Sequence, residues 1–205
     1  MKLIDLKVSE YLEILSSNAP APGGGSASAL AGAQGAALLA MVCKLTLGKE
    51  KFIDYQEINE EIKNDALKLS AALIEAIDED TVAFLMVAGA YKLPRSTDEE
   101  KEIRSGAIQE ASIAAIEIPL SVMRRAHEGL YLILKLKGKT NPSADSDLGV
   151  AALNFFMSVS GAWLNVKINL PAISDEEKAE DYRQEGQKIY DSAKTTWEGL
   201  KWLNS

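Results

Sequence analysis

Apolar residues recur every three or four positions along most of the chain, with charged residues between them, and this spacing is typical of amphipathic helices. Six segments carry the pattern or an Ala-rich variant of it: 6–17, 26–47, 52–93, 98–136, 148–169 and 174–200. At 205 residues the chain has the usual length of one domain. We therefore predict an all-α fold, a single domain over residues 1–205 with a bundle of about five to six helices, some long and kinked.

Glycine, proline and short polar side chains predict where these helices begin, end or bend. Ser9 is a possible cap for the first helix, and Gly48 is placed to end the second. Thr97, followed by three acidic residues, predicts the next start, and Pro119 predicts a kink. A break in the long third segment would fall near Asp78–Asp80. Residues 165–170 alternate like a strand, but their length and helical setting favour a helix.

The balance of charge restricts the partners. With 30 acidic and 22 basic residues the net charge is -8, which argues against nucleic acid or an anionic membrane surface. Residues 26–43 carry no charge, but they are mostly Ala, Gly and Ser, which suit a helix buried among helices better than a bilayer. Cys43 is the single cysteine, and no secretion signal is evident, so we expect a cytoplasmic protein.

Metal and thiol chemistry are poor candidates for this chain. His127 is the single histidine and cannot form a multi-histidine metal site. Cys43 lies in the Ala-rich segment without a base nearby in the sequence. We expect no metal, and a structural role for both residues.

The most distinctive loop contains Pro22, Gly23, Gly24, Gly25 and Ser26, directly before the Ala-rich helix. Glycines at a helix start leave backbone N–H groups unobstructed, which suits a carboxylate, a phosphate or a developing negative charge. The alternative is that the glycines only allow a tight turn into a crowded helix.

A second group of polar residues lies in and after the loop that precedes residue 148. Asp145 and Asp147 stand at a predicted helix start, where capping alone would explain them. Further along, Gly161, Asn165 and Asn169 recur every four residues and so share one helix face. An amide-lined groove beside carboxylates would suit a heteroaromatic ring.

The acidic run Asp78-Glu79-Asp80 offers a further carboxylate. If the helix continues through the run, at least one of these side chains can face other helices, and partial burial would raise its pKa toward use as a general acid or base. Most runs of this kind are simply solvated.

Several motifs together resemble those of one enzyme family. They are residues 21–26 (APGGGS), 41–49 (MVCKLTLGK), 80–84 (DTVAF), 93–95 (LPR), 146–152 (SDLGVAA) and 161–169 (GAWLNVKIN). In this order they are similar to the cyclodeaminase/cyclohydrolase family, which comprises the stand-alone bacterial methenyltetrahydrofolate cyclohydrolase and the cyclodeaminase half of formiminotransferase-cyclodeaminase. The resemblance covers nearly the whole chain. It implies an all-helical subunit that forms homodimers and binds tetrahydrofolate between helices.

With this resemblance, the candidate residues receive hypothetical roles. Asp147 or Asp80 would transfer the proton, and we expect no cofactor beyond the folate substrate. The residues expected to bind folate are Pro22, Gly23, Gly24, Gly25, Ser26, Asp145, Asn165 and Asn169. Lys44 and Lys49 would meet the glutamate tail. We expect the two polar loops to share a cavity, within a subunit or across a dimer.

We consider three functions, two that the resemblance implies and one from a different class. The first is hydrolysis of 5,10-methenyltetrahydrofolate to 10-formyltetrahydrofolate, favoured because the chain has no formiminotransferase domain. The second is cyclodeamination of 5-formiminotetrahydrofolate. The third is a non-catalytic helical module whose Ala/Gly-rich surface only serves oligomerisation.

Overall fold

The computed structural model describes residues 2–200 and contains helices and connecting turns but no strand in that range. Six α-helices form the fold: α1 (Val8–Leu15), α2 (Gly24–Thr46), α3 (Gln56–Tyr91), α4 (Asp98–Lys135), α5 (Asp145–Asn169) and α6 (Glu176–Gly199). Four short 3-10 helices join them, η1 (Leu3–Asp5), η2 (Glu50–Tyr55), η3 (Pro142–Ala144) and η4 (Leu170–Ala172). The predicted all-α bundle is confirmed.

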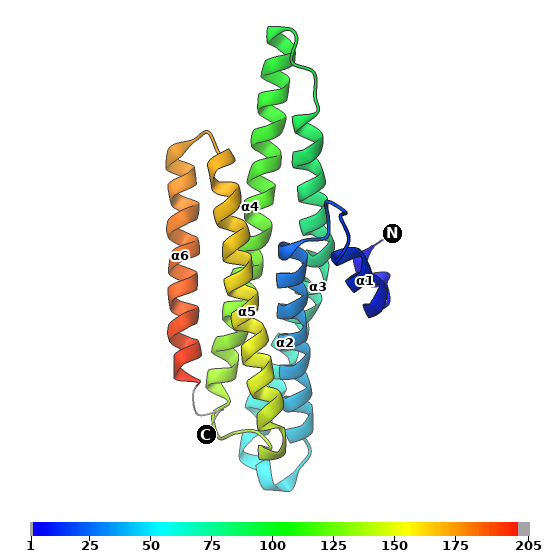
Figure 1. Cartoon of the computed structure of the whole chain (residues 1–205). Helices are drawn as coiled ribbons and strands as arrows, with labels where there is room; N and C mark the ends of the chain where they lie inside the picture. Colours follow the sequence, from blue (N-terminus) through cyan, green and yellow to red (C-terminus); the bar gives the residue numbers. More distant parts are fainter. Residues whose placement is uncertain (1, 201–205) are drawn as a thin grey trace.

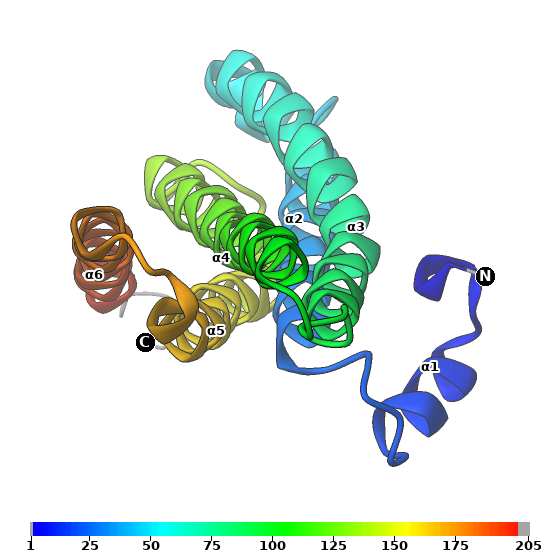
Figure 2. The same cartoon turned by 90° about the horizontal axis from the view of Figure 1, so that it is seen from above.

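The five long helices run alongside one another, and α2 is central to the packing. It packs against α3 and α5, while α4 lies behind it and packs against α3, α5 and α6 (Figures 1 and 2). The far ends of α3 and α4 project beyond the other helices (Figure 1). Helix α1 stands beside the bundle, next to the start of α2 (Figure 2).

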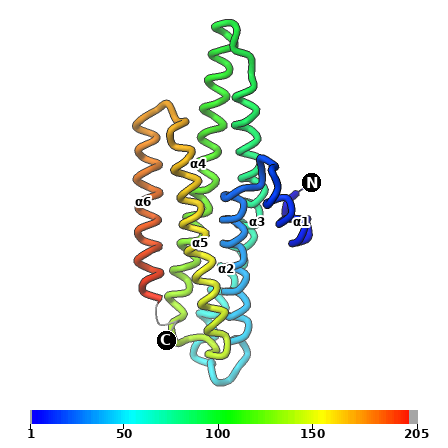
Figure 3. Tube along the Cα trace, in the orientation of Figure 1, coloured from blue at the N-terminus to red at the C-terminus, as the bar shows by residue number. Residues whose placement is uncertain are grey.

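Small residues bring α2 and α5 close together. A Cβ placed on Gly35 would lie 3.0 Å from the carbonyl oxygen of Ala151, and one placed on Gly32 would lie 2.7 Å from Oγ of Ser158. Because contacts advance along α2 as they retreat along α5, the two helices are antiparallel. The start of α2 therefore lies beside the end of α5 (Figure 3).

The open question of a break in α3 is settled, and two helix starts near the N-terminus differ from the predictions. Helix α3 continues through Asp78–Asp80 without a break. The first helix begins after Lys7 rather than at Ser9, and the backbone N–H of Lys7 donates to Glu10. Helix α2 begins at Gly24, which places two of the loop glycines inside its first turn.

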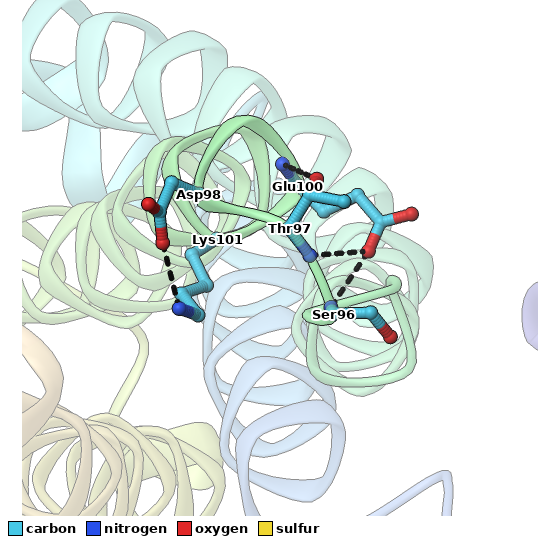
Figure 4. A network of polar contacts seen from close by, with 5 residues as sticks. All are labelled: Ser96, Thr97, Asp98, Glu100 and Lys101. Carbon is cyan, nitrogen blue, oxygen red and sulfur yellow. Dashed lines mark hydrogen bonds and ion pairs between the residues drawn. The ribbon is translucent and has the colours of Figure 1, made fainter.

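Two other boundary predictions are confirmed. Gly48 follows the end of α2 with φ +73°, and Thr97 caps the start of α4. Helix α4 continues through Pro119, where a kink remains a prediction. At the start of α4, the Thr97 hydroxyl accepts a hydrogen bond from the N–H of Glu100, whose carboxylate accepts from Ser96 and Thr97 (Figure 4). This reciprocal capping begins α4 at the tip of the projecting helix pair.

Two helical segments, Gly24–Thr46 and Pro142–Ala172, are long and apolar enough to cross a membrane by length and composition. Within the subunit, 67% of the most apolar window of the first and 44% of that of the second are buried. Helix α2 lies among the other helices of the subunit, and a helix buried in a protein core has the same length and composition as a membrane span.

Candidate functional site

A cavity of about 360 Å³ lies where the start of α2 meets α3, α4 and the end of α5. Its walls are Pro20, Ala21 and the three loop glycines, Asp80, Ala83, Phe84 and Val87 of α3, Ala115, Ile118 and Pro119 of α4, and Asn165, Ile168 and Asn169 of α5. Its volume falls within the range of small-molecule sites, roughly 300–1,000 Å³. Among these lining residues, Asp80 is the one ionisable side chain.

Asp80 is held against the first turn of α2 by Ser26. The backbone N–H of Ser26 donates to Oδ2 of Asp80 at 2.8 Å, and the Ser26 hydroxyl donates to the same oxygen at 3.0 Å. No hydrogen bond from the described residues reaches Oδ1. One carboxylate oxygen is thus fixed by Ser26, and the other, Oδ1, lies against Gly25 and accepts no hydrogen bond from the described residues.

Glycine is required at position 25 because the Asp80 carboxylate takes the space of a side chain. A Cβ on Gly25 would overlap the Asp80 carboxyl group, whereas a Cβ on Gly23 would meet no atom within 4 Å. Neither Gly24 nor Gly25 has a positive φ. The two readings of the loop are therefore compatible, since the glycines allow close approach and also line the cavity.

Burial makes the Asp80 carboxyl group a weaker acid than an exposed aspartate. Desolvation raises the pKa of Asp80 above its ordinary value of 3.8, and the two hydrogen bonds from Ser26 partly oppose that rise. A carboxylate with a raised pKa accepts a proton more readily, which is the property of a general base.

Two amides line the wall opposite Asp80. Nδ2 of Asn165 donates to the Gly161 carbonyl at 2.9 Å, and Nδ2 of Asn169 donates to the Ala115 carbonyl at 3.0 Å. With the amide nitrogens occupied, neither side-chain oxygen accepts a hydrogen bond from a described residue. These oxygens are acceptors suited to ring N–H and amino groups.

An apolar wall completes the cavity, and the sequence did not single out its residues. Phe84 remains 43% exposed and Ile168 76% exposed at the cavity, with Val87 and Ile118 deeper along the wall. Each of them looks like an ordinary apolar position in a helical pattern. Phe84 and Asp80 lie four residues apart on α3, so one helix face supplies both a carboxylate and an aromatic ring.

Two residues that were expected to bind folate are buried next to the cavity but do not line it. Pro22 is buried, in a cis peptide bond with Ala21, and does not line the cavity. Ser26 is fully buried and contacts Asp80 rather than the open space. The loop thus contributes its backbone and glycines to the cavity, while Ser26 positions the carboxylate.

Four expected residues lie at the other end of the subunit. Asp145 and Asp147 are in the first turn of α5, and Lys44 and Lys49 lie at and beyond the last turn of α2. The N–H of Asn141 donates to Thr46 Oγ1 at 2.9 Å and so joins these two helix ends. Since 20 residues of α-helix span about 30 Å, these four residues do not share the cavity within one subunit. Their roles remain predictions.

His127 and Cys43, for which a structural role was expected, do not line the cavity. The imidazole of His127 forms a 3.0 Å hydrogen bond with the Ser192 hydroxyl, and burial lowers its pKa. Burial raises the pKa of the Cys43 thiol to about 12. Within residues 2–200, no group of three or more metal-binding side chains comes together.

The sequence of the chain is similar to those of several known proteins. The family described as formiminotransferase-cyclodeaminase matches residues 7–188. A methenyltetrahydrofolate cyclohydrolase of Methylorubrum extorquens is 37% identical over 199 residues, covering 92% of this chain and 96% of that protein. The formimidoyltransferase-cyclodeaminase of Rattus norvegicus is 33% identical over 193 residues, which are 94% of this chain and 36% of that longer protein.

A solved structure shows the same fold. The crystal structure of a formiminotetrahydrofolate cyclodeaminase from Thermotoga maritima matches with a TM-score of 0.87 and 26% identity, covering 97% of this chain and 95% of that one. The resemblance seen in the sequence motifs is thereby confirmed along nearly the whole chain. The chain belongs to the formiminotransferase-cyclodeaminase family.

Proposed function

We propose that the protein is a methenyltetrahydrofolate cyclohydrolase, which converts 5,10-methenyltetrahydrofolate and water to 10-formyltetrahydrofolate. The observation that carries the proposal is the half-buried carboxylate of Asp80, which lines the cavity and is held through one oxygen by Ser26. The relative from Methylorubrum extorquens, which carries this activity in its name, matches over nearly the full length of both chains.

The chemistry needs one group that takes a proton from water beside a cation. As the water oxygen bonds to the bridging carbon, the Asp80 carboxylate accepts a water proton, and its negative charge stabilises the cationic methenyl group before attack. The resulting carbinolamine opens when the carbon–N5 bond breaks. The remaining hydroxyl proton is lost as the formyl C=O forms, and N5 gains a proton, so the reaction releases one proton overall.

The rest of the cavity suits a reduced pterin. The free side-chain oxygens of Asn165 and Asn169 accept hydrogen bonds from ring N–H and amino groups, and Phe84 and Val87 contact the apolar parts of the ring. Directional acceptors on one wall and apolar contacts on the others would orient the bridging carbon toward Asp80.

The proposal is tested by comparing Asp80→Asn with Asp147→Asn as a matched control. Turnover is measured as loss of the methenyl chromophore, and folate affinity is measured by calorimetry. We expect Asp80→Asn to reduce kcat by about 10²–10⁴, the range that general-base catalysis contributes, and to weaken folate binding by a smaller factor because the attraction between the carboxylate and the cationic substrate is lost. Asp147→Asn should remain near wild-type, because Asp147 lies at the far end of α5. Full turnover by Asp80→Asn would reject the proposal.

Cyclodeamination of 5-formiminotetrahydrofolate is the second candidate, favoured by the likeness to the Thermotoga maritima structure. In that reaction N10 attacks the formimino carbon, and the protonated form of one carboxyl would donate to the departing ammonia. The raised pKa of Asp80 is compatible with that role too. Ammonia release from 5-formiminotetrahydrofolate, with no loss of the methenyl chromophore, would select it.

We also propose that two subunits pair through the outer face of α2 and α5. No charged residue lies between Gly24 and Lys44 or between Asp147 and Lys167. Large apolar side chains are nevertheless exposed there: Met41, Leu45, Val150, Leu153, Met157, Leu164 and Ile168. An uncharged apolar face of this length suits a second copy of the chain.

A further inference from the structure

Pro119 removes one hydrogen-bond donor from α4 at the wall of the cavity. In an α-helix, the carbonyl of Ala115 would accept a hydrogen bond from the backbone N–H of residue 119. Proline has no N–H, and its ring also crowds the carbonyl four residues before it. Ala115 and Pro119 are both buried, and both line the cavity. Helix α4 thus leaves a buried carbonyl without its usual donor, and a buried carbonyl without any partner costs free energy.

Asn169, the last residue of α5, supplies the missing donor from another helix. Its Nδ2 lies 3.0 Å from the Ala115 carbonyl oxygen. Because a carbonyl can only accept, the amide nitrogen must face α4, and Oδ1 must point away from that carbonyl. Oδ1 accepts no hydrogen bond from the described residues, and it is not one of their buried unpartnered atoms. Asn169 lines the cavity, so this oxygen is the acceptor that it can offer to a bound molecule.

The other two side-chain amides of α5 are held differently. Asn165 and Asn154 each donate through Nδ2 to the carbonyl four residues before them on the same helix, both at 2.9 Å. Those carbonyls already have a helical donor, which is the backbone N–H of the same asparagine. Asn169 is the one of the three whose acceptor has lost its helical donor. The orientation of the Asn169 amide therefore depends on a residue of the neighbouring helix, Pro119.

A second tie between α4 and the segment after α5 holds the backbone near Asn169. Nε2 of Gln109 donates to the Ala172 carbonyl at 3.0 Å, and the N–H of Ser174 donates to Oε1 of Gln109 at 2.9 Å. This tie involves neither the Asn169 side chain nor Pro119. A substitution at either position is therefore expected to leave the end of α5 beside α4, so that its effect reports on the amide and not on a displaced helix.

We propose that Pro119 is a positioning residue for Asn169, because it frees the Ala115 carbonyl that fixes the amide with its oxygen offered to the ligand. This inference rests on the proposed function and deepens it by stating what the bound ring must present. A ring edge that carries N–H or amino donors is favoured, whereas an edge that carries acceptors meets another acceptor. Pro119 acts on this preference through Asn169 and takes no part in the proton transfer at Asp80.

The first test is a double-mutant cycle of Pro119→Ala and Asn169→Ala, measured as KM and kcat for 5,10-methenyltetrahydrofolate. Asn169→Ala should raise KM about ten-fold with kcat nearly unchanged, since it removes a hydrogen bond used in binding. Pro119→Ala gives the Ala115 carbonyl its helical donor and should raise KM about three-fold, since the bond that orients the amide is weakened. In the double variant, KM should equal that of Asn169→Ala alone, because no amide remains to be oriented.

Asn154→Ala is the matched control for this cycle. It removes an amide from the same helix, but Asn154 donates to a carbonyl of its own helix and does not line the cavity. We expect its KM and kcat to equal those of the unsubstituted protein.

The second test needs no ligand and reports directly on the amide. Exchange of side-chain amide protons with water is measured by NMR, and the Asn169 signals are those that disappear in Asn169→Ala. We expect Pro119→Ala to speed the exchange of the Asn169 protons about ten-fold, because their hydrogen bond to Ala115 is weakened. The Asn165 protons, assigned in the same way, are the internal control and should exchange at an unchanged rate.

Three results would overturn the inference. If Pro119→Ala leaves KM unchanged, or if the KM factors of the two single variants multiply in the double variant, Pro119 does not act through Asn169. If kcat falls while KM is kept, the amide acts in the chemical step and not in binding. If the Asn169 protons exchange equally fast with and without Pro119, the proline does not hold the amide. Absence of turnover by the unsubstituted protein would instead reject the proposed function, and the exchange measurement would still decide whether Pro119 orients Asn169.

Discussion

Ser26 directs two donors, its backbone N–H and its hydroxyl, to a single oxygen of Asp80, at 2.8 and 3.0 Å. Ser26 is fully buried in the first turn of α2, and Asp80 is in the second half of α3. The pair thus joins two helices at the edge of the cavity. Because both donors favour the charged carboxylate, Ser26 limits the rise in pKa that burial causes.

Ser26→Ala is expected to shift the acid side of the pH–rate profile to higher pH. The substitution removes the hydroxyl donor but keeps the backbone one, so the pKa of Asp80 rises further and less of it is ionised at a given pH. The pH dependence of kcat for loss of the methenyl chromophore measures this shift. Ser28→Ala is the control, because the Ser28 hydroxyl donates to the Gly24 carbonyl and not to Asp80. An unchanged profile for Ser26→Ala would contradict the assignment of the proton-accepting group to Asp80.

Asp80→Asn is expected to stabilise the ligand-free protein increasingly as pH rises. The pKa of Asp80 is raised in the folded state, so the folded protein binds more protons than the unfolded chain between the ordinary value of 3.8 and the folded value. The contribution of the neutral carboxyl to the free energy of unfolding is therefore fully present below the ordinary pKa of 3.8. It is lost as pH rises from that value through the raised pKa of the folded protein. Asparagine does not ionise and avoids the loss. Denaturant unfolding at several pH values measures the difference, and a difference that shrinks with rising pH would contradict the direction of the shift.

The sequence predicted the fold well because helix formation depends on local spacing. Apolar periodicity located five long helices, and Thr97 and Gly48 marked boundaries through capping and a positive φ. Whether α3 breaks at Asp78–Asp80 was left open by the sequence, and the helix is continuous there, with contacts to η1 and α2 on either side of the run. Local charge density alone does not report that packing.

Part of the candidate site was predicted from the sequence, and helix geometry explains why the rest was not. The loop glycines, Asp80, Asn165 and Asn169 meet at one cavity. Asp147, however, is 18 residues from Asn165 on the same helix, a separation of about 27 Å. Two groups of motifs at opposite ends of one helix cannot line one small cavity within a subunit. Phe84 carried no local signal of a place in the site, because that place depends on which helices pack together.

Gly25→Ala is expected to abolish most turnover, whereas Gly23→Ala should be tolerated. A methyl group at position 25 would overlap the Asp80 carboxyl, so the carboxylate must leave its position beside Ser26. At position 23 a methyl group meets nothing within 4 Å, and its φ of -135° suits any residue. Overpacking at position 25 should also cost about 1–3 kcal/mol of the free energy of unfolding. Turnover and denaturant unfolding of both variants check this, and equal activities would contradict the steric argument.

Leu164→Glu is expected to convert a dimer into monomers. Leu164 is 62% exposed on the uncharged stretch of α5, and a charge there would lose its hydration in the pairing proposed above. Ile103→Glu is the matched control, because Ile103 is 60% exposed on α4 near the projecting tip and outside that face. Light scattering coupled to size-exclusion chromatography gives the mass of each variant. A monomeric unsubstituted protein, or a Leu164→Glu variant that remains dimeric, would show that the α2–α5 face is not the interface.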